Sequence, residues 1–282
     1  MKISEYRREI QKTLKSLFGD EAAPLCDVML SNFLDIDFSG LILKSDEQVT
    51  EQLKQNVAAA IDELGYGVPI QYILGSCWFY GMKIIVGKGC FIPRSDTENL
   101  VKAAIASIPQ NGTFVDICSG SGCITAAVCK SRTDVRGYAL EYSQKALPFT
   151  EKNTEDFNNA TVCRFDAMDS DDYISVCEQN GGFFDAVLCN PPYIKTLDID
   201  FLQQQVLFEP HNALDGGDDG LLFYREITRF LPLILKEDGV VFFEIGIDQS
   251  REVCAILNDG GFQTATIKDI NGIERVVLGK KY

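Results

Sequence analysis

The sequence predicts an α/β domain with a seven-stranded, mostly parallel sheet, preceded by a small helical bundle. Apolar residues recur at helical spacing through residues 1–75, whereas short apolar strands alternate with helical segments from residue 113 onward. The last two strands follow one another without a helix between them. A chain of 282 residues has the length of one large domain or two modest ones, and we expect two.

The helical bundle is predicted to occupy residues 1–75. Three helices are expected, and Ser45 is predicted to cap the third, which Gly65 ends. The expected apolar stripes are Ile3, Ile10, Leu14 and Leu17, then Leu25, Val28, Met29 and Phe33, then Leu53, Val57, Ala60, Ile61 and Leu64.

A linker is predicted at residues 76–92, because two short β-like runs in residues 76–88 flank Gly81 and indicate a hairpin. The larger domain is predicted at residues 93–282, and its first helix begins near Ser95.

Seven strands are predicted in the larger domain: Thr113–Ile117, Arg136–Glu141, Thr161–Phe165, Phe184–Cys189, Val240–Ile245, Gln263–Ile267 and Glu274–Leu278. Helical segments separate the first five, which therefore pair in parallel through crossovers. The final strand follows a turn at Asp269–Gly272, so we expect it to run antiparallel inside the sheet.

Composition excludes several classes of protein. Asp and Glu total 41 against 26 Lys and Arg, a net charge of −15, which opposes direct nucleic-acid binding. No run of about 18 apolar residues predicts a membrane span. The ten cysteines form no CxxC pair and the chain has one histidine, so we expect no metal site. We expect the cysteines to be reduced thiols of a cytoplasmic protein.

A glycine-containing loop follows the first predicted strand. Cys118, Ser119, Gly120, Ser121 and Gly122 precede a helix, and two glycines allow backbone N–H groups to approach a ligand closely. The loop lacks the GxGxxG spacing of a dinucleotide site. Taken alone, it is also compatible with an ordinary glycine-rich turn.

Carboxylates stand at the ends of three successive strands. Asp116 can meet a ligand ammonium, Glu141 can accept both hydroxyls of a ribose, and Asp166 with Ala167 can contact an adenine amino group. Together with the glycine loop, these positions predict a site for S-adenosylmethionine.

The fourth strand is followed directly by Asn190, Pro191, Pro192 and Tyr193. It should lie beside the first strand, so this loop should face the glycine loop. Two prolines remove N–H donors and leave carbonyls free, and the Asn190 side chain adds another acceptor. A pair of acceptors suits a planar NH2 group, on which Tyr193 can stack. These four residues are therefore predicted to bind the substrate, with Asn190, Pro191 and Tyr193 catalytic.

At this point the chain resembles the HemK/PrmC family, the protein-(glutamine-N5) methyltransferases of peptide-chain release factors. The similarity runs from about residue 69 to 279. Its further segments are Pro69–Gly75, Phe79–Gly81, Phe91–Glu98, Glu209–Arg225, Phe243–Gly246 with Gln249, and Gly272–Val277.

The resemblance implies a class I methyltransferase fold (Rossmann-like) and transfer of a methyl group from S-adenosylmethionine to the glutamine amide of the release-factor Gly-Gly-Gln motif. Release factors are then the protein partners, which the helical domain of residues 1–75 would recognise, and we expect a monomer. Phe91 joins Asn190, Pro191 and Tyr193 in the substrate pocket. The implied cofactor residues are Asp116, Cys118, Ser119, Gly120, Ser121, Gly122, Glu141, Asp166, Ala167 and Asn190.

Three positions depart from the family pattern. Cys118 replaces the first glycine of the loop, Ser119 replaces a threonine, and Glu141 is one methylene longer than the usual aspartate.

Other functions remain open at this level. Adenine-N6 methylation of nucleic acid uses a similar Asn-Pro-Pro loop, a ribosomal protein glutamine is an alternative acceptor, and a binding module could merely hold a nucleoside. Arg94 could serve the substrate or pair with Glu98 or Glu209, and the sequence does not separate these roles. Glu209 is expected to orient the Asn190 loop, and His211 is expected to lie on the surface.

Overall fold

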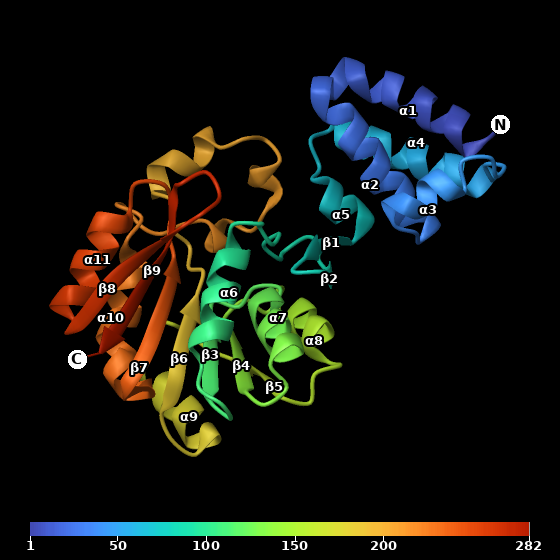
Figure 1. Ribbon diagram of the computed structural model, residues 1–282. Helices are drawn as coiled ribbons and strands as arrows, with labels where there is room; N and C mark the ends of the chain where they lie inside the picture. The colour runs from blue at the N-terminus through green and yellow to red at the C-terminus, as the bar shows by residue number, and fades with distance from the viewer. Residues whose placement is uncertain (282) are drawn as a thin grey trace. The chain divides into compact units, whose positions relative to one another are not determined.

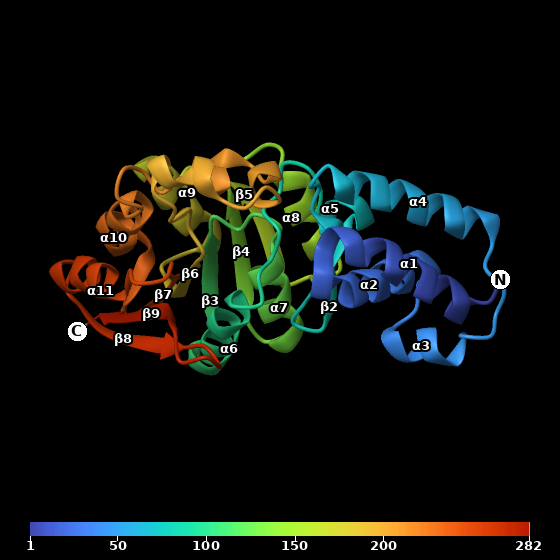
Figure 2. The same cartoon turned by 90° about the horizontal axis from the view of Figure 1, so that it is seen from above.

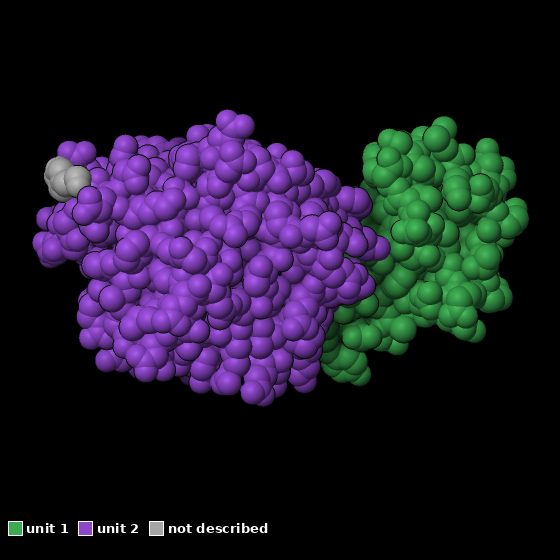
Figure 3. Space-filling view, turned by 90° about the horizontal axis from the view of Figure 1, so that it is seen from below, with its two compact units in different colours: residues 1–76, 204–208 green, residues 77–203, 209–282 purple. Residues whose placement is uncertain are grey.

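The computed structural model describes residues 1–281 and divides into two compact units, coloured separately in Figure 3. The first unit comprises residues 1–76 with 204–208, and the second comprises residues 77–203 and the chain from residue 209. Each unit has a hydrophobic core of its own.

The first unit is helical. Its helices are α1 (Ile3–Phe18), α2 (Ala22–Leu34), α3 (Phe38–Leu43), α4 (Glu51–Gly65) and α5 (Ile70–Leu74). Leu14, Cys26, Met29 and Leu30 are fully buried at its centre. Helix α2 packs against α1, α3, α4 and α5, which places it in the middle of the bundle.

The predicted start of the third helix at Ser45 is wrong. The cap of helix α4 lies five residues later, where the Thr50 side chain accepts a hydrogen bond from the Leu53 N–H at 3.1 Å. The backbone of Ser45 is engaged elsewhere, because its carbonyl accepts from the Ser4 N–H at 2.9 Å at the start of α1. A local capping signal was therefore overridden by a contact across the bundle.

Parts of the predicted apolar stripes also point outward. Leu17 and Val28 are exposed, whereas Cys26 and Leu30 fill the core of the bundle. The short helices α3 and α5 were not predicted, since runs of five or six residues give too little periodicity to detect.

The hairpin expected at residues 76–88 is present. Strands β1 (Ser76–Phe79) and β2 (Met82–Ile85) pair through a two-residue turn. Tyr80 and Gly81 have φ values of 48° and 67°, as a hairpin turn with two left-handed residues requires.

The second unit contains the seven-stranded sheet. Its strands are β3 (Thr113–Ile117), β4 (Arg136–Glu141), β5 (Ala160–Arg164), β6 (Phe184–Cys189), β7 (Leu235–Glu244), β8 (Phe262–Lys268) and β9 (Glu274–Lys281). They lie in the order β5-β4-β3-β6-β7-β9-β8. The expected fold class is confirmed, including the pairing of β6 beside β3 and the antiparallel course of β9 between β7 and β8.

Helices cover both faces of this sheet. They are α6 (Thr97–Ser107), α7 (Cys123–Ser131), α8 (Leu147–Thr154), α9 (Ser170–Asn180), α10 (Leu222–Ile234) and α11 (Ser250–Asp259). Figure 1 and Figure 2 show α6 and α7 on one side of the sheet and α9 and α10 on the other. Both faces of the strands are therefore buried, which explains their nearly continuous apolar sequences.

Parallel pairing brings the carboxyl ends of β3, β4, β5, β6 and β7 to one edge of the sheet. The segments that leave these ends contain the glycine loop, Glu141, Asp166 and Asn190. Within residues 1–281, no helix has the length and apolar character needed to cross a membrane.

A close approach in the sheet gives a stability prediction. Gly137 of β4 lies opposite Phe114 of β3, and a Cβ at residue 137 would lie 2.3 Å from Cζ of that ring. We expect Gly137→Ala to lower the free energy of unfolding by about 1–3 kcal/mol, measured by urea denaturation. If the double variant with Phe114→Leu shows no smaller penalty for the added methyl, the ring contact is not the cause.

Candidate functional site

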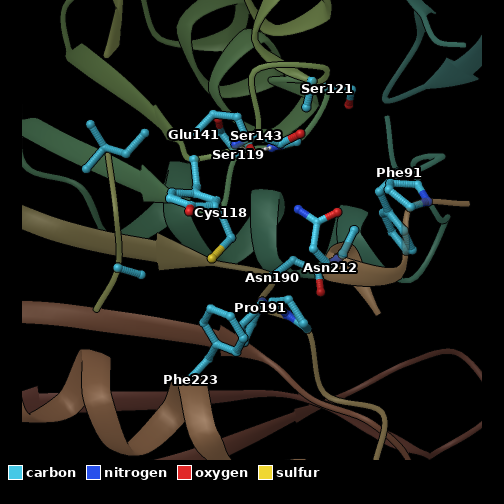
Figure 4. A pocket seen from close by; sticks show the side chains of 18 of the residues that line it. Phe91, Cys118, Ser119, Ser121, Glu141, Ser143, Asn190, Pro191, Asn212 and Phe223 are labelled. Carbon is cyan, nitrogen blue, oxygen red and sulfur yellow. Dashed lines mark hydrogen bonds between the residues drawn. The ribbon is translucent and has the colours of Figure 1, made fainter. Parts of the chain in front are cut away.

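A cavity of about 350 Å³ lies at the carboxyl edge of the sheet. Its walls come from the segments after β3, β4, β5 and β6, together with residues 210–214 and the start of α10. Figure 4 shows Ser119, Glu141 and Ser143 on one side and Asn190, Pro191 and Phe223 on the opposite side. Ligands of open α/β sheets bind at this kind of crevice.

The glycine loop is fixed by hydrogen bonds to its backbone. The Ser119 N–H donates to the Leu140 carbonyl at 3.1 Å, and the Thr150 hydroxyl donates to the Gly120 carbonyl at 2.8 Å. Gly122 has a φ of 75°, and a Cβ there would lie 3.0 Å from Cγ2 of Thr150. Cys118 adopts a φ of 61°, so the cysteine occupies a backbone conformation that favours glycine.

Glu141 braces this loop from the end of β4. One carboxylate oxygen accepts from the Gly120 N–H and the other from the Ser143 N–H, both at 2.7 Å. Burial raises the pKa of Glu141, and these backbone hydrogen bonds oppose the rise. The carboxylate is thus held at the cavity wall with lone pairs that remain for hydroxyl donors.

Asp116 lies beneath the loop and does not line the cavity. Its Oδ2 atom accepts from the Thr125 N–H at 3.2 Å and from the Thr125 hydroxyl at 2.8 Å. Its Oδ1 atom is buried without a partner among the described residues. Burial raises the pKa of Asp116 to about 7.

The third acidic position follows β5. Asp166 and Ala167 line the cavity beside Phe165 and Met168. Oδ1 of Asp166 accepts from the Met168 N–H at 2.9 Å, and the Ala167 carbonyl accepts from the Tyr173 hydroxyl at 3.0 Å. These bonds fix the segment as a mostly apolar wall with one carboxylate.

All four residues of the loop after β6 line the cavity: Asn190, Pro191, Pro192 and Tyr193. Nδ2 of Asn190 donates to the Thr97 hydroxyl at 3.3 Å. Nε2 of Gln249 donates to the Tyr193 carbonyl at 3.1 Å and holds the far side of the loop.

A glycine segment packs against the same loop. The Gly216 N–H donates to the Ile194 carbonyl at 2.8 Å. A Cβ at Gly216 would lie 2.8 Å from the Pro192 carbonyl oxygen, so only glycine allows this contact. The segment therefore supports the proline loop from behind.

The structure corrects the expected role of Glu209. Its side chain does not hold the Asn190 loop but accepts from the Ile92 N–H at 2.9 Å and pairs with Arg94. The Arg94 guanidinium lies 4.8 Å from the centre of the Phe91 ring. Glu209 and Arg94 thus fix the segment that presents Phe91 to the cavity.

Most of the predicted site residues meet at this cavity: Phe91, Cys118, Ser119, Gly120, Ser121, Glu141, Asp166, Ala167, Asn190, Pro191, Pro192 and Tyr193. Asp116 and Gly122 lie behind the lining. The His211 side chain is 65% exposed and its Nδ1 lies 3.8 Å from Asp215, outside the cavity wall.

Sequence reasoning missed several lining residues. Asn212 lies near Asn190 and Phe91 in Figure 4, and Thr97, Ser143 and Phe223 also contribute. Asn212 follows the Glu209-Pro210 pair of the family-like segment by two residues, which was the available signal in the sequence.

Comparisons with known proteins bear on the whole chain. A family model described as the PrmC N-terminal domain matches residues 5–75, and one described as conserved hypothetical protein 95 matches residues 97–215. The release factor glutamine methyltransferase of Thermodesulfovibrio yellowstonii is 34% identical over 100% of this chain and 99% of its own length. The chain belongs to the release factor glutamine methyltransferase family. The family resemblance expected from the motifs is confirmed, and the protein is a methyltransferase.

A second relative has the same description. The release factor glutamine methyltransferase of Geobacter sulfurreducens is 35% identical over 89% of this chain and 87% of its own length. Among solved structures, a ribosomal protein L11 methylase from Lactobacillus delbrueckii subsp. bulgaricus superposes with a TM-score of 0.47 at 16% identity, over 69% of this chain and 82% of that one.

The buried Asp116 gives a pH prediction. Its folded-state pKa of about 7 lies above the ordinary 3.8, so its contribution to stability declines as the pH rises between these values. Between about pH 5.5 and pH 8, Asp116 should lower the free energy of unfolding by about 2 kcal/mol. We expect Asp116→Asn to reduce the pH dependence by this amount, measured by urea denaturation at both pH values.

Asp134→Asn is the control for this measurement. Arg132 lowers the pKa of Asp134, so that carboxylate is ionised in both states throughout this pH window. Its removal should leave the difference between the two pH values unchanged. Identical pH dependence in wild type and Asp116→Asn would contradict the assignment.

Proposed function

We propose that this protein transfers the methyl group of S-adenosylmethionine to the side-chain amide nitrogen of the glutamine in the Gly-Gly-Gln motif of peptide chain release factors. The observation that carries the proposal is that the Asn-Pro-Pro-Tyr loop and the glycine loop with Glu141 line one cavity. The named relatives support the choice of acceptor.

The residues present fit S-adenosylmethionine. Glu141 can accept ribose hydroxyls, and Asp166 and Ala167, which line the same cavity, can contact an adenine. Asp116 lies beneath the glycine loop with an unpartnered Oδ1, and its ionised form would add negative potential that favours an ammonium group. When bound, the cofactor supplies a methyl group that its sulfonium has already activated.

The chain's own residues would orient the acceptor. An amide nitrogen is a weak nucleophile because its lone pair is delocalised into the carbonyl group. Oδ1 of Asn190 and the backbone carbonyl of Pro191 can accept both amide hydrogens and hold the nitrogen toward the cofactor side. Phe91 and Tyr193 enclose the planar group and exclude water.

The two carboxylates of the lining, Glu141 and Asp166, belong to the cofactor side, and among the described residues the acceptor side carries no titratable base. Across the described residues 1–281, the cavity wall includes neither lysine, arginine nor histidine. We therefore assign the chemistry to positioning, with the proton leaving to water after transfer. The helical first unit would dock the release factor, and the reaction would take place in the cytoplasm.

The decisive experiment offers methyl-labelled S-adenosylmethionine and a purified release factor to the protein. We expect label on the release factor and none on a copy whose Gly-Gly-Gln glutamine is changed to alanine. Label on both copies would contradict the assigned acceptor residue. Label on neither would contradict the proposed substrate and direct the search to ribosomal protein.

Asn190→Ala tests the proposed roles in the loop. Loss of the side-chain acceptor should lower kcat at least about 100-fold, because the amide is no longer aligned, while the Kd for S-adenosylmethionine changes less than about threefold. Single-turnover methylation and calorimetry measure the two effects. Asn271→Ala, in the exposed turn between β8 and β9, is the matched control and should keep wild-type turnover.

A further inference from the structure

Glu244 is a buried carboxylate that the proposed reaction does not yet use. It ends β7, and β7 pairs in parallel with β6 so that Phe243 lies opposite Cys189. Asn190 and Glu244 are the next residues after this pair, so they lie side by side. The Glu244 residue is 2% exposed.

Three polar side chains meet at this point. Phe243 packs edge-on against Tyr224 on the α10 face of the sheet, so the alternation along β7 turns Glu244 toward the opposite face, where α6 begins with Thr97. The Glu244 carboxyl group faces the side chains of Thr97 and Asn190, whose donor groups lower its pKa, and its Oε2 atom is buried without a hydrogen-bond partner among the described residues. Nδ2 of Asn190 also donates to the Thr97 hydroxyl at 3.3 Å, which closes the cluster.

The donors and acceptors of this cluster allow one arrangement when Glu244 is ionised. A carboxylate only accepts hydrogen bonds, so the Thr97 hydroxyl must donate its single hydrogen to Glu244 and can then only accept from Asn190. Both contacts of Asn190 consequently use its NH2 group. Its carbonyl oxygen Oδ1 is left as the atom available to the cavity.

We propose that Glu244 is a positioning residue that fixes the orientation of the Asn190 side-chain amide, so that Oδ1 faces the acceptor nitrogen of the substrate. The inference rests on the proposed function, because it explains how the loop accepts rather than donates at that atom. A reversed amide would present NH2 to another NH2 group and would bind the substrate glutamine poorly.

The charge state of Glu244 should control this orientation. Burial raises the pKa of Glu244 to about 7, and the hydrogen bonds from Thr97 and Asn190 oppose the rise. The titratable and charged groups near it on the packed elements are Asp96, Arg275, Tyr193, Tyr224 and Cys189. Protonation turns the carboxyl group into a donor, which allows the Asn190 amide to reverse.

Glu244→Gln tests the proposal. Glutamine keeps the shape but can donate to Asn190, so we expect kcat for release-factor methylation to fall about tenfold with Kd for S-adenosylmethionine and Tm near wild type. In wild type, kcat should also decrease as the pH falls below about 7, and Glu244→Gln should lack this step. Wild-type kcat with a wild-type pH profile in the variant overturns the proposal.

Asp185→Asn is the matched control. Asp185 is a largely buried carboxylate near the opposite end of β6, where it accepts from the Thr113 N–H at 2.8 Å and pairs with Lys236 at 2.7 Å. Its loss should lower Tm and leave kcat and the pH profile unchanged. A Glu244→Gln variant that behaves in the same way shows a merely structural role and also overturns the proposal.

A second variant protects the test if Glu244→Gln does not fold. Thr97→Val removes a hydrogen bond that lowers the pKa of Glu244, so the fall in kcat should move to higher pH. An unmoved profile at wild-type kcat contradicts the proposal.

A final measurement needs no methyl acceptor. The side-chain amide resonance of Asn190, assigned by its loss in Asn190→Ala, should titrate near pH 7 in wild type and not in Glu244→Gln. If the Asn190 resonance does not titrate, the proposed role of Glu244 is overturned. If it titrates but the release factor gains no methyl label, only the proposed substrate is overturned.

Discussion

Parallel pairing of the central strands is the constraint on which the site depends. Ile117 of β3 lies opposite Cys189 of β6, which in turn lies opposite Phe243 of β7. Because these strands end in register, the glycine loop, Asn190 and Glu244 leave the sheet at one level. Strands β4 and β5 extend the same edge and add Glu141 and Asp166. The backbone ladder thus brings residues far apart in the chain to one edge, where side-chain hydrogen bonds such as Gln249 to the Tyr193 carbonyl fix the loops.

The buried carboxylates around this edge are stabilised in different ways, and the differences follow their positions. Glu141 receives two backbone N–H groups, and Glu209 receives one together with the Arg94 guanidinium. Asp116 and Glu244 each keep a buried oxygen without a partner among the described residues, and burial raises the pKa of both to about 7. Such arrangements oppose folding stability, and their concentration beside one cavity is typical of a functional site rather than of packing.

The sequence predicted the sheet well because its strands are short apolar runs separated by strong turn signals. The bounds of β3, β4 and β6 agree with expectation, and alternation with helices gave the parallel pairing. Strand β7 begins at Leu235, five residues before the predicted Val240. The prediction missed these residues because the polar run after Leu235 has the composition of a turn. The contact of Asn190 with Thr97 could not be predicted, and that of Arg94 with Glu209 was one of several alternatives, because they join segments 93 and 115 residues apart. Contacts of that kind depend on side-chain packing, which no local pattern records.

Two separate requirements meet in the cavity, and the lining divides accordingly. The cofactor side carries Glu141 and Asp166, with Asp116 behind them, and this negative potential suits a cation such as a sulfonium with an ammonium group. The acceptor side consists of the proline loop, Phe91 and Tyr193, which offer oxygen acceptors and aromatic surfaces to a neutral amide. A strong base near the proline loop would itself compete for the activated methyl group. The absence of lysine and histidine from the lining of the described residues is therefore consistent with catalysis by alignment, in which the orientation of one asparagine amide matters more than any proton acceptor.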